Sequence, residues 1–290
     1  MKKSTHAFLL ILLAAPAVAG RISVRVNGGM NYISPKEYND AIKGRNAYLS
    51  EKVAIPPMQG RLSPFHTGWN LDGEVVWSFM KNFSVGLGAG VTRFATDDRL
   101  TYQYPTTSET YLFGGTYHNK ASVTVVPIAL KLHYALPLGN AILLTAGFGP
   151  SLNLCSFKYA FDFTGGYMGA ADWNSTQTLN AHKTVPGFEG EVGFEIPLAE
   201  KIFAGISIGG RFAELSEFTG DYAEVGTDGT ESWDIRSKEG YLFFYDYVRD
   251  GKVYRQYGYS DSPNPVYSNF QKGIIDLSGL FVKAVVRIEL

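Results

Sequence analysis

The chain has 290 residues and a formal net charge of −1 at pH 7, from 26 basic and 27 acidic side chains. This balance excludes the strongly basic surface typical of nucleic-acid binding, so no nucleic-acid partner is expected. A single cysteine, Cys155, excludes an internal disulfide. Because no Cys/His cluster has metal-ligand spacing, we expect neither a metal nor another cofactor.

The first 19 residues are typical of a secretory signal peptide. Two lysines precede the apolar run AFLLILLAA (7–15), and a small-x-small sequence then ends at Ala19. The run is too short to cross a bilayer as a helix, which takes roughly 20 apolar residues. We therefore predict a signal peptide over 1–19 and one exported domain over 20–290.

In chain order, eight segments then alternate large apolar side chains with small or polar ones. Such alternation predicts strands with two different faces. About ten residues, the length of these segments, are enough for a tilted strand to cross a bilayer. The segments cover residues 22–32, 69–79, 83–93, 122–134, 142–153, 186–196, 202–212 and 278–290.

The connections alternate in length. Three are short: Met80–Asn82, Leu136–Asn140 and Ala199–Lys201. In outer-membrane barrels short turns face the periplasm and long loops face outward. We therefore predict an all-β fold, an eight-stranded antiparallel up-and-down transmembrane barrel with four long extracellular loops, at about 33–65, 95–121, 157–185 and 215–275.

The small or polar face of these strands carries almost equal numbers of acids and bases. A soluble sandwich would expose this face to water, and nothing would require the charges to cancel. Inside a narrow barrel, charges must be paired, because an unpaired buried charge is costly. We therefore expect Arg211 beside Glu189, Arg25 beside Glu74, and a lumen charge network of Arg25, Asp72, Glu74, Lys131, His133, Glu189, Glu191, Glu195, Arg211, Lys283, Arg287 and Glu289.

Aromatic side chains cluster at the two predicted membrane edges. Outer-membrane barrels carry aromatic girdles at both interfaces, whereas β-propensity alone also enriches aromatic residues in strands. The clustering by depth favours girdles. They comprise Tyr32, Trp69, Phe188 and Phe212 at the long-loop end, and Phe79, Phe83, Tyr134 and Phe194 at the short-turn end.

The segment VTVVPIALKLHY, the turn LPLGN and the strand LLTAGFGP resemble the small eight-stranded outer-membrane barrels, the OmpA/OmpX-like family. The resemblance covers about residues 20–290 and carries no catalytic signature. It implies a monomer in the bacterial outer membrane that contacts lipid and the assembly machinery. No peptidoglycan-binding domain follows the last strand, so periplasmic anchoring is not expected. The chain ends in Leu290 rather than the usual aromatic residue.

Two of the long connections contain local signals. In residues 34–49, Ser34, Pro35 and Glu37 fit a capped helix start, so we predict a short helix over the rim rather than a plug in the lumen. Residues 241–259 form two β runs around Asp250-Gly251, a hairpin signal. We favour an extracellular hairpin over a second transmembrane pair, which would give ten strands. Its candidate binding residues are Tyr241, Tyr245, Tyr247, Tyr254 and Tyr257.

No spacing among the loop histidines His66, His118 and His182 and the loop acids is specific for catalysis. We therefore expect a non-enzymatic protein with a structural or surface-interaction role, in which the long loops contact an extracellular ligand or surface partner. Two alternatives stay open. One is a narrow porin or small-solute channel through the charged lumen, and the other is an outer-membrane enzyme.

Overall fold

The computed structural model describes residues 20–52, 59–105, 112–139, 141–167, 172–262 and 268–290. The predicted signal peptide lies outside these residues. These described residues form thirteen strands and one helix, and all their strand pairs are antiparallel. Among the described residues, no helix is long and apolar enough to cross a membrane.

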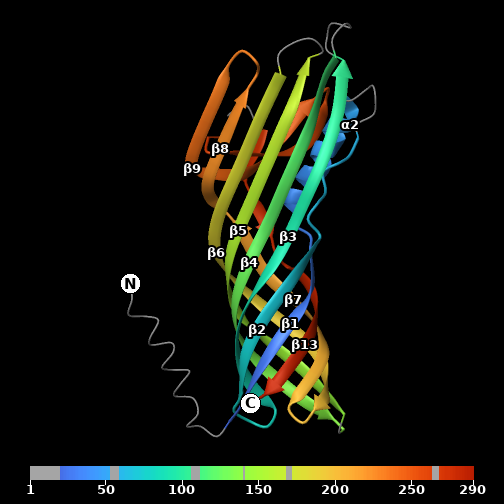
Figure 1. Ribbon diagram of the computed structural model, residues 1–290, viewed down its shortest axis with the longest axis vertical. Helices are drawn as coiled ribbons and strands as arrows, with labels where there is room; N and C mark the ends of the chain where they lie inside the picture. The colour runs from blue at the N-terminus through green and yellow to red at the C-terminus, as the bar shows by residue number, and fades with distance from the viewer. Residues whose placement is uncertain (1–19, 53–58, 106–111, 140, 168–171, 263–267) are drawn as a thin grey trace.

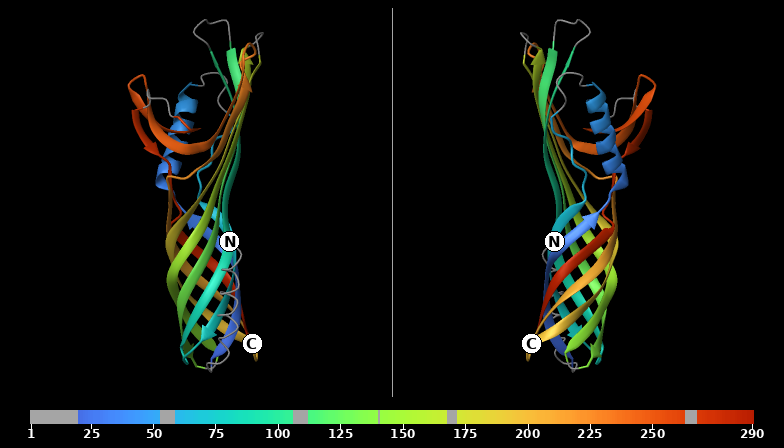
Figure 2. Two further views of the ribbon diagram at one scale, coloured as in Figure 1. Left: turned by 90° about the vertical axis from the view of Figure 1, so that its left-hand side faces the viewer. Right: turned by 90° about the vertical axis from the view of Figure 1, so that its right-hand side faces the viewer.

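Eight of the strands pair in a closed ring, in the order β1-β2-β3-β4-β5-β6-β7-β13 and back to β1. Figures 1 and 2 show the ring as the lower half of an elongated molecule. The ring strands are β1 (Arg21–Ile33), β2 (Thr67–Ser78), β3 (Phe83–Pro105), β4 (Leu112–Leu138), β5 (Ile142–Tyr167), β6 (Asp172–Ala199), β7 (Ile202–Ser216) and β13 (Gly279–Glu289).

Strands β3 to β6 are 23 to 28 residues long, about twice the length of β1 and β2. They run past the ring and form a tall wall on one side of the molecule (Figure 1). The prediction of long loops at 95–121 and 157–185 is therefore wrong over most of both segments, which continue these strands. We call the end of the ring that carries the three short turns the short-turn end.

Five further strands lie beyond the ring, so the predicted total of eight strands is also wrong. They occupy much of the predicted loop 215–275: β8 (Thr219–Thr227), β9 (Ser232–Arg249), β10 (Lys252–Ser260), β11 (Ser268–Lys272) and β12 (Ile274–Asp276). Strand β8 extends the tall wall by pairing with β6, and β9 joins β8 to β10. We use the term upper module for these five strands, the helix α2, and the parts of β3 to β6 above the ring.

The predicted hairpin over 241–259 is confirmed. Strands β9 and β10 pair from Tyr241↔Ser260 to Arg249↔Lys252, so two residues make the turn. Those residues, Asp250 and Gly251, have φ of 49° and 74°. Positive φ at both positions is typical of the two-residue turns that match the right-handed twist of the paired strands. Neither strand belongs to the ring, so the ten-stranded alternative does not apply to the described chain.

The predicted rim helix is also confirmed, as α2 (Lys36–Lys52), which is longer than expected. Its buried side chains recur at helical spacing, at Tyr38, Ala41, Ile42 and Leu49. Gly44 lies against the backbone of Arg255 in β10, where a side chain would not fit. The helix therefore packs inside the upper module, above the ring (Figure 2).

The two faces of the tall wall exchange character at one row of paired residues. Arg93, Thr124, Ser156 and His182 are neighbours in this row on β3, β4, β5 and β6. We call it the boundary row. Below it, outward side chains such as Val91 and Leu154 are apolar, and above it they are mainly polar.

The inward face changes in the opposite sense at the same level. The inward row beside the boundary row is Phe94, Val123, Phe157 and Ala181, and each of these side chains is at most 1% exposed. Further down, the inward face carries charged side chains instead. Because the same strands run through both levels, the molecule has a polar interior below the row and an apolar interior above it.

Candidate functional site

The interior of the ring is filled by ion pairs, and Arg25 on β1 is at their centre. Its guanidinium lies 3.0 Å from Glu191, 3.4 Å from Glu74 and 3.7 Å from Glu195. These carboxylates come from β2 and β6, so one arginine joins both sides of the ring. All four side chains are at most 4% exposed. Removing water from charges is favourable only with such close partners.

A second set of pairs surrounds Glu189. The Arg211 Nε donates to Glu189 at 2.8 Å, and the Lys131 Nζ lies 3.5 Å from the same carboxylate. Lys131 also lies 3.9 Å from Glu191, which connects this set to Arg25. The His133 Nε2 is 2.7 Å from Glu74 Oε1.

Three further ion pairs lie toward the ends of the ring. The Lys283 Nζ is 2.8 Å from Asp72, to which Asn27 also donates a hydrogen bond at 2.6 Å. Arg287 binds Glu195 and Glu289, both at 2.7 Å. The structure thus brings eleven side chains of the expected lumen network into ion pairs on the inner face, and the twelfth, His133, into a hydrogen bond with Glu74; ten of the twelve are connected through Arg25, Lys131, Glu189 and Glu195.

Glycine on the inner face makes room for these long side chains. A Cβ added at Gly86 would collide with the Glu74 carboxylate, and one at Gly147 would collide with the His133 ring. The ring of eight strands is narrow enough for side chains to fill it. Small residues at some inward positions therefore allow large charged residues at others.

The cavities match this packing. A cavity of about 810 Å³ opens at the short-turn end, and it is lined in part by Ser23, Arg25, His133, Glu195 and Arg287. Beyond this vestibule, the space among Asp72, Lys131, Glu189, Arg211 and Lys283 is about 20 Å³, which is close to the volume that one water needs. The charged side chains thus close the interior of the ring.

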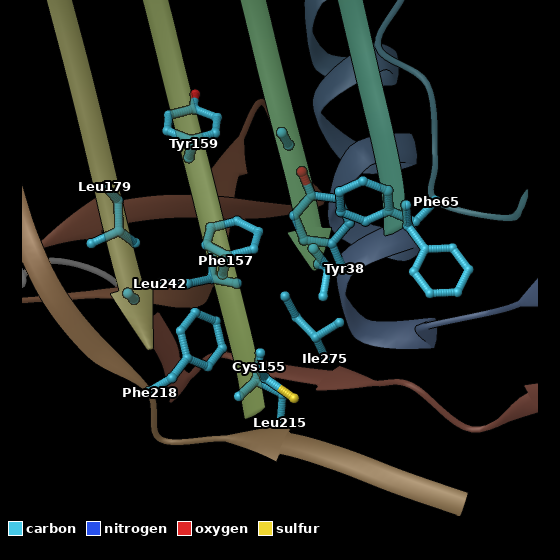
Figure 3. Close-up of a cluster of buried hydrophobic side chains, with 14 of the residues drawn as sticks. Tyr38, Phe65, Cys155, Phe157, Tyr159, Leu179, Leu215, Phe218, Leu242 and Ile275 are labelled. Atoms are coloured by element: carbon cyan, nitrogen blue, oxygen red, sulfur yellow. The ribbon is translucent and has the colours of Figure 1, made fainter. Parts of the chain in front are cut away.

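An apolar core lies above the charged region (Figure 3). It joins side chains of the tall wall to α2, β7, β9 and β12, and its members are buried. The labelled side chains come from these elements and, for Phe65 and Phe218, from the connections before β2 and β8: Tyr38, Phe65, Cys155, Phe157, Tyr159, Leu179, Leu215, Phe218, Leu242 and Ile275. Two different barriers, one ionic and one apolar, therefore follow each other along the axis of the ring.

The five candidate tyrosines of the β9–β10 hairpin have different environments. Tyr254 and Tyr257 are buried, at 7% and 3% exposure. The prediction that these two side chains are available for binding is therefore wrong. Tyr257 stacks on Tyr38 at 5.8 Å, beneath α2. Tyr241 and Tyr245 are partly exposed, and Tyr247 is 37% exposed. Sequence reasoning also missed the exposed pair Val248 and Val253 near the hairpin tip, at 59% and 62%.

The hairpin is held to the last turn of α2 by a charged contact. Glu51 accepts hydrogen bonds from Lys252 at 2.8 Å and from the Tyr254 hydroxyl at 2.5 Å. The bond from Lys252, followed by that from Tyr254, lowers the pKa of Glu51, and the same carboxylate raises the pKa of Lys252 and of Tyr254. This contact joins the hairpin, near its tip, to the last turn of the helix.

One histidine–carboxylate pair lies on the tall wall. The His118 Nε2 is 2.6 Å from Asp97 Oδ1, and this hydrogen bond is the main cause of the lowered pKa of Asp97. The two residues lie 21 positions apart on β4 and β3, so no local motif could reveal them. His66 stacks on Tyr32, and His182 is exposed on β6. Within the described part of the chain, no three His, Cys, Asp or Glu residues form a group that could hold a metal ion.

The expected girdle residues face outward at the two ends of the ring. Tyr32, Trp69, Phe188 and Phe212 are exposed at the end below the upper module. Phe83, Tyr134 and Phe194 are exposed at the short-turn end, where the rings of Phe83 and Tyr134 lie 5.0 Å apart, and Phe79 is partly exposed. Their role as membrane girdles stays a prediction.

A family model described as outer membrane protein beta-barrel domain matches residues 5–249. No curated protein sequence matches the chain significantly. Among solved structures, the chain is similar to the outer membrane protease OmpT from Escherichia coli, with 10% sequence identity and a TM-score of 0.27. The match covers 93% of this chain and 96% of OmpT.

The match to OmpT overturns the expectation of a non-enzymatic protein, because a structure similar to this chain is that of an enzyme. The sequence offered no basis for the exclusion beyond the lack of a catalytic motif, and active-site residues on separate strands need no such motif. At this TM-score, the likeness carries no argument for protease activity in this chain. An enzymatic role therefore stays open.

Proposed function

We propose, from the membership of this chain in the family of outer membrane protein β-barrel domains, that it spans the membrane as a closed eight-stranded barrel and presents the upper module to the outside of the cell. The chain is a protein of the bacterial outer membrane. In this proposal the short turns face the periplasm. The upper module then makes contact with an extracellular surface or ligand.

The observation that carries the proposal is the exchange of faces at the boundary row. Below the row, the outward face has the apolar side chains that a bilayer requires, and the inward face is polar. Above it, both faces have the polarity of a water-soluble domain, with Phe94 and Phe157 inside and Lys120 and Lys158 outside. A change of solvent from lipid to water at this level accounts for both faces at once.

The same geometry argues against the channel alternative. An ion or solute entering from the vestibule would have to separate Arg25 from its three glutamates, and then pass the apolar core around Phe157 and Leu215. Breaking a buried pair by removing one partner costs roughly 3–5 kcal/mol. We therefore infer that the barrel is closed, and that its function depends on the upper module.

The placement is tested by cysteine labelling on intact cells with a membrane-impermeant maleimide. The native Cys155 is buried, so single added cysteines report their own positions. Val253→Cys, at the hairpin tip, should react on intact cells. Met80→Cys, in the short turn between β2 and β3, has the same 62% exposure and should react only after the outer membrane is opened. Labelling of Met80→Cys alone on intact cells would show the opposite orientation.

Closure is tested by conductance of the refolded protein in a planar bilayer. The wild-type protein should give no steady channels. Steady channels that respond to Glu191→Gln would establish a path through the ionic cluster and overturn the closed barrel. The cysteine labelling does not depend on conductance. The orientation of the barrel in the membrane and the closure of its interior are therefore tested separately.

A further inference from the structure

Basic side chains are exposed on the outward face of the tall wall, at and just above the boundary row. Arg93 on β3 and His182 on β6 belong to the row itself. Lys158 on β5 lies two residues beyond Ser156 on the same face. We call Arg93, Thr124, Ser156, Lys158 and His182 the basic patch.

The polar groups of this patch have few protein partners. Within the described part of the chain, neither Arg93 nor Lys158 makes an ion pair. The Ser156 Oγ in the middle of the patch is inaccessible to solvent and has no hydrogen-bond partner there. By contrast, Lys120, higher on the same face, lies 3.7 Å from Asp97. The patch therefore contains two cations, Arg93 and Lys158, that no carboxylate of the described residues neutralises.

The patch lies on one side of the molecule only. On the other strands, the outward side chains near this level are aromatic or apolar, such as Tyr32, Phe212 and Leu280. The first outward charge on β7 is the acid Glu214. On β8, beyond the patch, Asp221 pairs with Asn180. Glu214 and Asp221 therefore lie beside the basic patch, and neither is part of it.

We propose that the basic patch binds the phosphate group of a lipid in the outer leaflet. The inference rests on the proposed orientation of the barrel in the membrane. Immediately below the patch, Val91 and Leu154 face outward in the apolar band. A lipid can therefore place its acyl chains on the band and its phosphate against the cations at the same time. A soluble anion would use only the second of these contacts.

The spacing suits one phosphate group. Neighbouring strands are about 4.8 Å apart, so the backbones of β3 and β5 are separated by about 10 Å. Arg93 and Lys158 have flexible side chains that can approach a common point between them, over Thr124 and Ser156. Hydrogen bonds from ionised donors to phosphate are among the strongest in proteins, and the Thr124 hydroxyl can add to them.

The test is lipid retention by the full chain, refolded in mixed micelles of phosphatidic acid and phosphatidylcholine with identical acyl chains. Native mass spectrometry counts the two lipids that stay bound. The wild-type protein should retain phosphatidic acid preferentially. Each basic side chain near an anionic lipid surface contributes about 1 kcal/mol, so Arg93→Gln and Lys158→Gln should each lower the preference about fivefold.

Arg99→Gln is the matched control. Arg99 lies on the same strand and face as Arg93, but six residues, about 20 Å, further from the apolar band. Its loss should leave the preference unchanged. An equal effect of Arg99→Gln, or no preference in the wild-type protein, would overturn the proposal. Displacement of phosphatidic acid by 10 mM inorganic phosphate (about a hundredfold excess over lipid) would also overturn it, because the patch would then be a soluble-anion site.

A failure of the proposed orientation would show itself differently. It would change the cysteine labelling of Val253→Cys and Met80→Cys, which does not depend on lipid charge. Correct labelling together with no preference for phosphatidic acid would reject the lipid site alone. Folding of each variant is checked by the migration of unboiled protein in electrophoresis, so that a misfolded variant is not counted as a loss of binding.

Discussion

Arg25 and Glu191 lie 166 positions apart in the sequence, and their side chains are in contact at 3.0 Å inside the ring. The pair joins β1 to β6, which are not neighbours in the ring. Arg25 also lies within 4 Å of Glu74 and Glu195, so its single positive charge is shared among three carboxylates. The stability of the closed ring therefore depends more on the arginine than on any one of its partners.

Replacing Arg25 should destabilise the protein more than replacing Glu191. Arg25→Met leaves three buried carboxylates without their shared cation, and removing one partner of a buried ion pair costs roughly 3–5 kcal/mol. Glu191→Gln keeps a hydrogen-bonding group in place and should cost less. Urea unfolding of the protein in lipid vesicles measures both. The exposed Arg21, 4.0 Å from Glu289, is the control, and Arg21→Gln should change stability by less than about 1 kcal/mol. Equal losses for Arg25→Met and Arg21→Gln would contradict the central role of Arg25.

Substitution of Gly44 in α2 should destabilise the upper module, although alanine favours helices over glycine by about 1 kcal/mol. A Cβ at this position would collide with the backbone oxygen of Arg255, so the helix must move away from β10. Overpacking of this kind costs about 1–3 kcal/mol, and the contact with a backbone oxygen, which cannot turn aside as a flexible side chain can, places Gly44→Ala above the low end of that range. Hydrogen exchange of the α2 amides should therefore be faster in Gly44→Ala. The exposed Lys43→Ala serves as control, and slower exchange in Gly44→Ala would show that the contact is not tight.

The contact between α2 and the hairpin should weaken in acid. The pKa of Glu51 is lower in the folded protein than in the unfolded chain, so the protonated carboxyl favours the unfolded state. The stabilisation is therefore present above the ordinary glutamate pKa, about 4.3, and is lost as pH falls through the lower folded value. Hydrogen exchange at the end of α2, followed from pH 6 to pH 3, should rise once the intrinsic pH dependence is subtracted. Glu51→Gln should remove this rise, and its persistence would assign the effect to another group.

The turn of the β9–β10 hairpin should not tolerate a β-branched residue at Gly251. This residue has a φ of 74°, and a Cβ added to it would meet nothing within 4 Å, so backbone strain alone decides the outcome. A β-branched side chain in the left-handed region is strained by roughly 1–3 kcal/mol. Gly251→Val should thus increase protease cleavage at the hairpin tip, whereas Gly251→Asn should have little effect. Equal cleavage of the two variants would show that the turn carries no such strain.

The exposed valines of the hairpin should matter for contact with an extracellular partner. Val248 and Val253 face each other across β9 and β10 and leave more than half of their surfaces open. The double substitution Val248→Ser/Val253→Ser should reduce binding of the purified protein to cells or matrix components at least severalfold, with unchanged thermal stability. Val225→Ser on β8, with 42% exposure, is the control. A change in stability without a change in binding would make the valines structural.

The sequence predicted the ring well because its alternation has a strict period of two. Residues 142–154 place apolar side chains at even positions, and the same alternation in 186–196 and 202–212 assigned Glu189 and Arg211 to the opposite, polar face. The alternation continues beyond Leu154, but its phase reverses. Cys155, Phe157 and Tyr159 are apolar or aromatic at odd positions, and they are buried. A search for this change of phase would have found the upper parts of the long strands.

Other features could not be obtained from local patterns. Arg25 and Glu191, or Asp97 and His118, meet only because the strands are paired in a particular register. The burial of Tyr254 and Tyr257 depends on where α2 is packed, although the sequence predicted both the helix and the hairpin. Local signals thus located the elements, whereas contacts between distant elements decided which side chains stay accessible.

The four strands β3 to β6 cross the boundary row without a break, and this has a mechanical consequence (Figure 2). A partner that pulls on the tall wall would load the backbone ladders along the strand direction, so that many hydrogen bonds bear the force together. A flexible tether between barrel and upper module would instead stretch and let the module turn. Here a pull, a tilt or a torque at the outer tip would pass directly into the barrel and the surrounding bilayer.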